Sequence, residues 1–319
     1  MLRRYFIVWS TAGALAAVIG HHATILADDL KQVRIGYQKA GVFPAVKQRG
    51  TVEAAFRSLG IAVKWVEFAY GPPLLEALNT GNVDYGFAGD LPPIYAQASS
   101  ANLQYVAAVP TSGLNEAIIV PADSPIRALT DLRSRKIGFG KGSSAHNTTL
   151  AALEKAGIPY ADITPVYLAP ADAAAAFAQG SLDAWTIWDP YLALAERDRG
   201  ARVLTFAKDV HTTSSFVLAN RGFTARHPEA IEKLNRIFAQ EAEWADQHRA
   251  EVAQILHDAT GVELDTVRRT VDRARFEVIP IGEQTIVNQQ AIADRFYKLG
   301  LIPRPITVRD IVWKWTPGS

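Results

Sequence analysis

The sequence predicts an α/β protein of two similar lobes, each a mostly parallel sheet flanked by helices. The chain has 319 residues, of which 49% are hydrophobic and 20% charged, enough for one large core or two medium ones. Short apolar strands alternate with helical segments, a pattern typical of parallel sheets. One strand–helix–strand pattern also occurs twice, about 100 residues apart. These three observations together predict two related α/β units.

The repeat relates VEFAYGPPLLEALNTGNVDYGFAGDLP, which begins at Val66, to VYLAPADAAAAFAQGSLDAWTIWDP, which begins at Val166. Three pairs of residues recur at a spacing of 99: Gly81 with Gly180, Asp84 with Asp183, and Asp90 with Asp189. Each glycine is expected to end a helix, because left-handed backbone is favourable for glycine. Upstream, VRIGYQKAG at 33–41 resembles RKIGFGKGS at 135–143, and both predict a strand, a loop and then a helix.

The repeat also predicts where a ligand would bind. Ligands of open α/β sheets lie beyond the carboxyl ends of the strands, close to helix N-termini. Two facing lobes would therefore place several loops around one cleft. The expected loops are 38–44, 70–74, 140–147 and 169–173, joined by the strand-end loops 89–93 and 188–191.

The segment KGSSAHN, residues 141–147, has three interpretations: a plain helix start, a site for an anion, or a hydrolase fragment. The hydrolase is disfavoured because the G-x-S-x-G elbow is absent. A phosphate-binding P-loop would need glycine at position 135 and Ser or Thr at 142, where the chain has Arg135 and Gly142. The helix start and the anion site both stay open on this evidence.

The anion interpretation depends on a helix that begins in this segment. Ser143 or Ser144 is a natural N-cap, and the expected helix runs through Leu150 and Leu153 to Gly157. The first N–H groups of a helix are unpaired, and its dipole favours negative charge. The serine hydroxyls, together with His146 and Asn147, would add donors.

IWDPY, residues 187–191, is the second unusual segment. Trp188 is expected either in the core or as a wall for an apolar ligand tail. Asp90 and Asp189 end the two repeated units. As carboxylates they would repel an anion, so we expect them to cap backbone or to pair with Lys or Arg; alternatively, they receive an ammonium group.

Composition excludes several classes of protein. The formal net charge is +1, so the chain lacks the excess of positive charge that is typical of nucleic-acid-binding proteins. The chain has no cysteine, so disulfides, thiolate metal sites and cysteine nucleophiles are excluded. The histidines after the N-terminal segment are not spaced as zinc ligands. No metal, cofactor or catalytic residue is therefore expected.

The N-terminal segment predicts export. MLRR precedes the apolar run YFIVWSTAGALAAVIG, and a polar segment follows Ala27. This pattern is typical of a signal peptide, residues 1–27, cleaved near Ala27; Arg3 and Arg4 also fit a twin-arginine signal. The alternative is an uncleaved membrane anchor, for which the run is short. Cleavage would remove two arginines and no acids, leaving a net charge of about −1.

The C-terminal part, from about Phe216, predicts packing helices. The segments 227–248, 249–261, 263–274 and 282–300 have helical periodicity; in the first, apolar residues share one face, and Pro228 lies at its start. Their charged residues are expected on solvated faces.

The chain resembles the periplasmic aliphatic sulfonate-binding proteins of ATP-binding-cassette (ABC) importers, which belong with the taurine- and nitrate-binding proteins. The resemblance rests on RIGYQK, VEFAYGPPLLEALNTGNVDYGFAGDLPPIYAQA, KGSSAHN, YLAPADAAAAFAQGSLDAW, IWDPY and IADRFYKLGLIP, spread over almost the whole expected mature chain. It implies a type II periplasmic binding fold, in which two crossovers, near 113–118 and 213–218, join the lobes. Lobe 1 would comprise 28–115 and 217–319, and lobe 2 would comprise 116–216.

The resemblance also implies a site and partners. The sulfonate would lie between the lobes, held by helix N-termini and hydroxyls, and the implied site residues are Gln38, Gly71, Pro72, Asp90, Ser143, Ser144, His146, Asn147, Trp188 and Asp189. The protein would be a periplasmic monomer that delivers its ligand to a membrane permease. Three residues leave open which sulfonates would bind. They are Phe43 and Pro44, which follow GYQK, and Glu116 near the first crossover. The alternative ligands are taurine, nitrate, a sulfate ester and a pyrimidine precursor. The alternative class of protein is an enzyme on the same fold.

Overall fold

The structure is a computed structural model, and it describes residues 30–212 and 214–316. The expected signal peptide therefore lies outside the described residues. The strands are β1 Gln32–Tyr37, β2 Ala62–Glu67, β3 Tyr85–Ala88, β4 Leu103–Pro110, β5 Glu116–Val120, β6 Lys136–Phe139, β7 Thr164–Tyr167, β8 Ala184–Trp188, β9 Arg202–Phe206 and β10 Ser214–Asn220. The α-helices are α1 Phe43–Arg49, α2 Thr51–Arg57, α3 Gly71–Asn79, α4 Leu91–Ala98, α5 Ser144–Lys155, α6 Pro170–Ala178, α7 Tyr191–Arg199, α8 Arg221–Arg226, α9 Pro228–Gln247, α10 Arg249–Thr260, α11 Leu264–Arg273 and α12 Glu283–Lys298.

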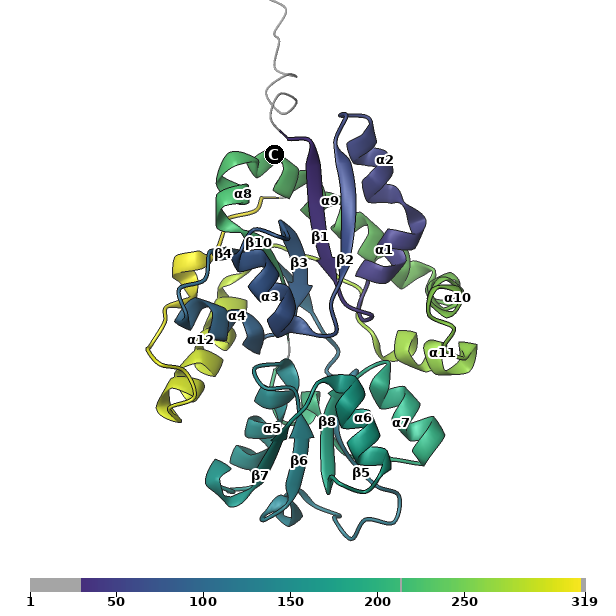
Figure 1. Cartoon of the computed structure of the whole chain (residues 1–319), viewed down its shortest axis with the longest axis vertical. Helices are drawn as coiled ribbons and strands as arrows, with labels where there is room; N and C mark the ends of the chain where they lie inside the picture. The colour runs from purple at the N-terminus through teal and green to yellow at the C-terminus, as the bar shows by residue number, and fades with distance from the viewer. Residues whose placement is uncertain (1–29, 213, 317–319) are drawn as a thin grey trace, which may run out of the picture.

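The described strands form two five-stranded sheets of matching topology, β2-β1-β3-β10-β4 and β7-β6-β8-β5-β9. In Figure 1 the first sheet builds the upper lobe and the second builds the lower, teal lobe. The upper lobe contains both the N-terminal strands and the C-terminal helices α8 to α12, as expected for a discontinuous lobe.

One strand in each sheet runs against its neighbours. β10 is antiparallel to β3 and β4, and β5 is antiparallel to β8 and β9. Both follow a crossover between the lobes, at 111–115 for β5 and 207–213 for β10. The parallel strands end at the junction of the lobes, so a strand that starts there must run the opposite way. Each sheet is therefore mixed: four of its five strands share one direction, and the strand that follows the crossover opposes them.

The position of the second crossover affects where the boundary between the lobes should be drawn. A boundary after Phe216 would divide β10, which pairs with β4 from Ser214 to Asn220. A division after residue 213 keeps that strand whole. The first expected boundary, between Asn115 and Glu116, coincides with the start of β5.

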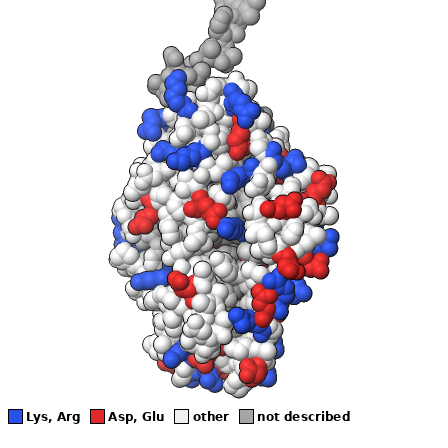
Figure 2. Space-filling view, turned by 45° about the vertical axis from the view of Figure 1, so that its right-hand side comes forward, with Lys and Arg blue, Asp and Glu red and all other residues white. Residues whose placement is uncertain are grey.

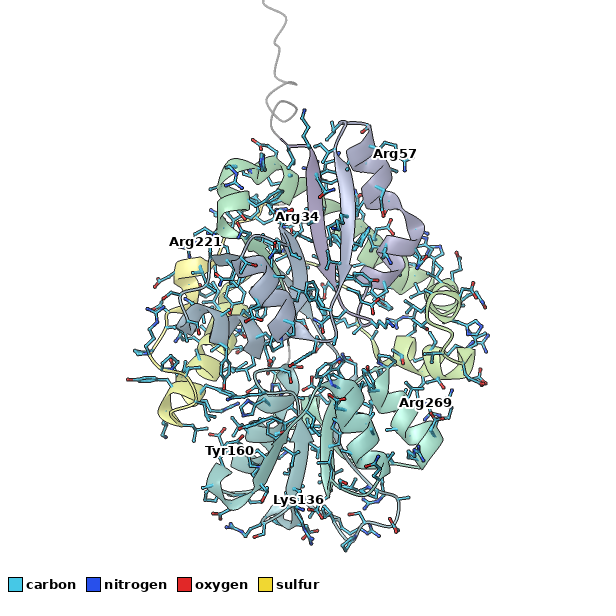
Figure 3. The ribbon with its side chains drawn as sticks, in the orientation of Figure 1. Arg34, Arg57, Lys136, Tyr160, Arg221 and Arg269 are labelled. Atoms are coloured by element: carbon cyan, nitrogen blue, oxygen red, sulfur yellow. The ribbon has the colours of Figure 1, made fainter. Side chains whose placement is uncertain are left out.

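The sequence repeat has a direct structural counterpart. Asp84 accepts a hydrogen bond from the amide of Arg34 at 2.8 Å, and Asp183 accepts one from the amide of Lys136 at 2.7 Å. Asp84 thus joins the loop before β3 to β1, and Asp183 joins the loop before β8 to β6. Figure 3 shows Lys136 at the end of the lower lobe far from the lobe junction. Gly81 and Gly180 both have left-handed backbone, with φ of +71° and +72°, as predicted for helix ends.

Apolar cores pack on both faces of each sheet. In the upper lobe, α1 and α9 cover one face, and α3, α4 and α12 cover the other (Figure 1). Fully buried Phe238 of α9 stacks on Phe43 of α1 with ring centroids 4.1 Å apart. Phe43, whose effect on ligand range the sequence left open, is therefore a core residue, 1% exposed.

The predicted C-terminal helices are present as α9 to α12, but some of their charges are not on solvated faces. Arg273 of α11 pairs with Glu196 of α7 at 2.7 Å and is 15% exposed. Arg295 of α12 pairs with Glu154 of α5 at 3.0 Å. These two helices therefore tie the upper lobe to the lower one. No helix among the described residues is long and apolar enough to cross a membrane.

Candidate ligand-binding site

A cavity of about 100 Å³ lies at the lobe junction, where β1, β3 and β8 end. It is lined by six of the ten predicted site residues: Gln38, Gly71, Ser143, Ser144, Trp188 and Asp189. Both strand-end loops contribute, as does the 140–147 loop. Among the described residues that line the cavity, none comes from the expected loop 169–173. The repeat thus predicted the place of the cavity and most of its walls.

The structure places the other four predicted residues elsewhere. Pro72 lines a separate, larger hollow of about 550 Å³ between α3, α4 and the Lys141–Gly142 turn. That hollow is lined mainly by prolines, aliphatic residues and tyrosines, and it is not at the strand ends. Asp90, His146 and Asn147 are buried and do not line the small cavity.

His146 faces the core. Its ring is fully buried, stacks on Phe139 at 4.9 Å and contacts Phe296 of α12 edge-on at 5.2 Å. Its Nε2 lies 3.2 Å from the hydroxyl of Tyr160. Burial, with help from Lys141, lowers the pKa of His146 to about 3, so the ring is neutral. It offers a ligand anion neither a contact nor a charge.

Asp90 and Asn147 form a buried contact between the lobes. The Asn147 amide donates to Asp90 Oδ2 at 2.7 Å, and Arg295 donates to Asn147 Oδ1 at 3.0 Å. Asp90 also caps α4 by accepting from the amide of Leu91 at 2.7 Å. Burial raises the pKa of Asp90 to about 7, although the Asn147 and Leu91 bonds lower it. The predicted capping role of Asp90 is confirmed.

The N-terminus of α5 opens onto the cavity with both of its serine hydroxyl hydrogens in use. Ser143 is the N-cap residue but makes no side-chain cap bond, because its hydroxyl donates to the Gly140 carbonyl at 2.7 Å. The Ser144 hydroxyl donates to Glu116 at 2.5 Å. The Ser143 and His146 amides also donate, to the carbonyls of Gly140 at 3.1 Å and Ser143 at 3.0 Å. The amides of Ser144 and Ala145, the first two of the helix, have no place in its hydrogen-bond ladder and suit an anion.

The upper-lobe helices around the cavity are poorer in donors. Pro72 and Pro73 occupy the first turn of α3, and Pro92 and Pro93 that of α4. Proline has no N–H, so these helix starts offer fewer amides than α5 does. Gly71 brings backbone close to the cavity, and a Cβ there would lie 2.7 Å from Pro92.

Gln38 and Trp188 separate the small cavity from a second one of about 330 Å³. The Gln38 amide donates to the Phe87 carbonyl at 2.9 Å, which fixes the side chain in place. The half-buried Trp188 ring contributes to both walls. The second cavity is lined by apolar residues that include Tyr191, Leu194 and Val262, and by the charged Lys39 and Glu67.

Asp189 caps α7 by accepting from the amide of Ala193 at 3.0 Å, and it lies 3.5 Å from Arg273. Burial raises its pKa to about 7, opposed by the nearby Arg273. Within residues 30–212 and 214–316, its Oδ2 has no hydrogen-bond partner. The two roles predicted for Asp189, capping backbone and pairing with an arginine, are confirmed. Its Oδ2 is the carboxylate oxygen that takes no part in them.

Sequence reasoning missed several polar residues of the cavity wall. Asn115 comes from the first crossover, Ser215 from the start of β10, and Thr270 and Arg275 from α11 and its end. Glu116 was not missed: the sequence left open whether it is a hinge residue or faces the cleft, and it lines the cavity as the first residue of β5. Arg275, paired with Glu277, was not distinguishable from other surface arginines.

Charged residues are spread over the visible surface. Figure 2 shows acidic and basic residues interspersed over the visible face, without a large area of one sign. No group of three or more His, Asp or Glu in the described part of the chain could hold a metal ion.

Comparisons with known proteins agree with this geometry. The NMT1/THI5-like family model matches residues 55–252. The alkanesulfonate-binding protein SsuA from Xanthomonas axonopodis pv. citri, solved with bound MOPS, is 40% identical and superposes with a TM-score of 0.86, covering 90% of this chain and 99% of that one. The periplasmic aliphatic sulphonate binding protein SsuA from Escherichia coli is 38% identical, with a TM-score of 0.81 and coverage of 90% and 93%.

The fold and the cavity between its lobes define a two-lobed binding protein of the periplasmic type. A curated sequence from Escherichia coli (strain K12) is likewise 38% identical over 286 residues, 89% of each chain. The chain belongs to the NMT1/THI5-like family and, within it, to the aliphatic sulfonate-binding proteins.

Proposed function

We propose that this protein captures an aliphatic sulfonate between its two lobes and delivers it to an ABC importer. The observation that carries the proposal is the start of α5, where Ser143 and Ser144 line the interlobe cavity and no side chain caps the helix. A sulfonate is a permanent monoanion with three equivalent oxygens, and neutral N–H donors can hold it without the desolvation cost of a fully buried cation.

The two cavities match the two parts of such a ligand. The small one has room for a head group, whereas pockets for larger ligands are usually roughly 300–1,000 Å³. The second, about 330 Å³, lies on the other side of Trp188 and Gln38 and would take the organic part. Trp188 would then pack on the ligand between its head and its tail.

The remaining parts of the proposal follow from the relatives. A binding protein needs no catalytic residue, and we propose none here. Export to the periplasm, with cleavage near Ala27, fits the N-terminal sequence and the periplasmic description of the Escherichia coli relative. The partners would be the sulfonate and a membrane permease, with the protein acting as a monomer and with no cofactor.

A ligand panel on the protein without residues 1–27 tests the function. Titration calorimetry should show binding of ethanesulfonate and pentanesulfonate, with sulfate and nitrate at least about tenfold weaker because they have no organic part to contact Trp188. An aryl sulfonate would report the width of the second cavity. If no sulfonate binds and none raises the melting temperature, the proposal is wrong.

A second candidate ligand is an amino sulfonate such as taurine. The observation that favours it is the unpartnered Oδ2 of Asp189 on the cavity wall, which could accept from an ammonium group. Taurine belongs in the same panel. If it binds tighter than ethanesulfonate, and if Asp189→Asn removes that preference, Asp189 receives the amine.

A further inference from the structure

A chain of hydrogen-bonded side chains leads away from the cavity to the second crossover. Ser144 donates to Glu116 Oε2 at 2.5 Å, and Thr148 donates to Glu116 Oε1. The Thr148 hydroxyl also lies 2.8 Å from His211 Nε2, and His211 Nδ1 lies 3.1 Å from the Thr212 carbonyl. Glu116 is 7% exposed, Thr148 0%, and the His211 side chain 7%.

The number of hydrogens in this chain restricts what Ser144 can do. A hydroxyl has one hydrogen, and an ionised carboxylate can only accept. While Glu116 is ionised, Ser144 directs its hydrogen at Glu116 and leaves lone pairs for the cavity. A sulfonate oxygen placed beside Ser144 would then meet an acceptor, with the Glu116 charge directly behind it.

One added proton reverses the direction of these bonds. A protonated Glu116 donates from Oε2 to Ser144 Oγ, and Ser144 in turn donates its own hydrogen to the sulfonate. Thr148 continues to donate to Oε1. Ser144, Thr148 and both Glu116 oxygens keep their partners, and His211 Nε2 donates to Thr148, whose own hydrogen is directed at Glu116. The added positive charge offsets the charge of the ligand in a buried place where unpaired charge is costly.

We propose that Glu116 is a specificity-determining residue that must be protonated for the sulfonate to bind, so that each bound anion requires one proton on the Ser144–Glu116–Thr148–His211 chain. The inference rests on the proposed function, since it needs a sulfonate beside Ser144. It implies that the site favours permanent monoanions, which stay ionised at the pH where Glu116 holds a proton.

The charged groups around Glu116 determine where it titrates. Burial raises its pKa, and the nearby Asp90 raises it further, whereas Ser144 and Thr148 lower it. Burial lowers the pKa of His211, which the Glu116 charge opposes. The other charged groups that face this region are Asp189 with Arg273 on the cavity wall, Arg275 at the end of α11, and Arg295 behind Asn147.

The expected pH dependence has a definite sign. Sulfonate binding stabilises the protonated form of Glu116 and so raises its pKa in the complex. The affinity for sulfonate is therefore highest below the pKa of Glu116 in the ligand-free protein. Above that pKa it falls as the pH rises, by up to about tenfold per pH unit.

Calorimetric titration with ethanesulfonate between pH 5 and pH 9 tests the proposal. In buffers of different ionisation enthalpy, the wild-type protein should take up about one proton per ligand in the range where affinity falls. Glu116→Gln keeps the shape and can donate its amide to Ser144, so its affinity should be independent of pH over that range. Glu283→Gln, an exposed carboxylate paired with Arg309, is the matched control and should keep the wild-type curve.

The outcomes separate this inference from the proposed function. If sulfonate binds with the same affinity from pH 5 to pH 9, or if Glu116→Gln keeps the wild-type pH dependence, the inference is wrong and the function stands. If no sulfonate binds at any pH, the function itself fails. Should Glu116→Gln not fold, Ser144→Ala serves instead: it removes the last donor of the chain, so binding should be weaker at pH 5 and flat with pH.

Discussion

Asn147→Ala is expected to weaken sulfonate binding by roughly 10–100-fold, although Asn147 does not line the cavity. The side chain bridges the lobes by donating to Asp90 and accepting from Arg295. Hydrogen bonds to charged groups contribute about 1.5–3 kcal/mol when they are buried. Alanine would leave Asp90 in the interior with one donor fewer, so the lobes would come together less readily around a ligand.

Asn288→Ala is the matched control for this prediction. Asn288 lies on α12 and makes an exposed side-chain bond with Gln284, so its loss should leave affinity within about twofold. Small-angle X-ray scattering of the ligand-free proteins provides a second readout, since Asn147→Ala should increase the radius of gyration. Wild-type affinity and an unchanged radius would show that this contact does not hold the lobes together.

Gly89→Val should also weaken binding by about 10–100-fold, because the lobes approach each other closely at this residue. Gly89 follows β3 in the upper lobe, and a Cβ on it would lie 2.9 Å from the Cβ of Ser144 in the lower lobe. The backbone of Gly89 is not left-handed, and the atoms nearest to an added Cβ all belong to Ser144. The substitution would push the start of α5 away from the cavity.

Gly282→Val separates this contact from a general effect of valine. A Cβ at Gly282 would have no heavy atom within 4 Å, and the backbone there is extended, with φ of −84°. Its affinity should equal that of wild type in the same calorimetric titration. Equal affinities for the Gly89 and Gly282 variants would mean that the lobes do not need this close approach to bind a ligand.

Much of the fold could be predicted because the chain repeats itself. Matched glycines and aspartates have the same role in both lobes, as Asp84 and Asp183 show by accepting from β1 and β6. The strands after the two crossovers were harder to assign. β10 forms part of the upper sheet, but its sequence does not show which lobe it joins, because pairing with β3 and β4 is a long-range property.

The site was only partly predictable, and His146 shows why. The segment KGSSAHN suggested that all of its polar residues share one task. However, His146, Leu150 and Leu153 follow the i, i+4, i+7 spacing of one helix face, and all three are buried. That spacing was the available signal that the ring faces the core.

Contacts between distant segments could not be read from the sequence at all. Glu116 starts β5, Thr148 lies on α5 and His211 lies in the second crossover, and they meet only because both crossovers lie at one junction. Arg273 and Arg295 resembled other surface arginines until the packing of α11 and α12 placed them against the lower lobe.

A crystal structure of the protein grown with ethanesulfonate is the most direct test of the central claim, that a sulfonate binds between the lobes at the start of α5. The expected result is a sulfonate whose oxygens lie within hydrogen-bonding distance of the first amides of α5 and of Ser144, with its carbon chain against Trp188. A sulfonate found in the hollow beside Pro72 and Lys141, or a cavity between Gln38 and Ser144 that stays free of ligand at saturating concentration, would contradict the account.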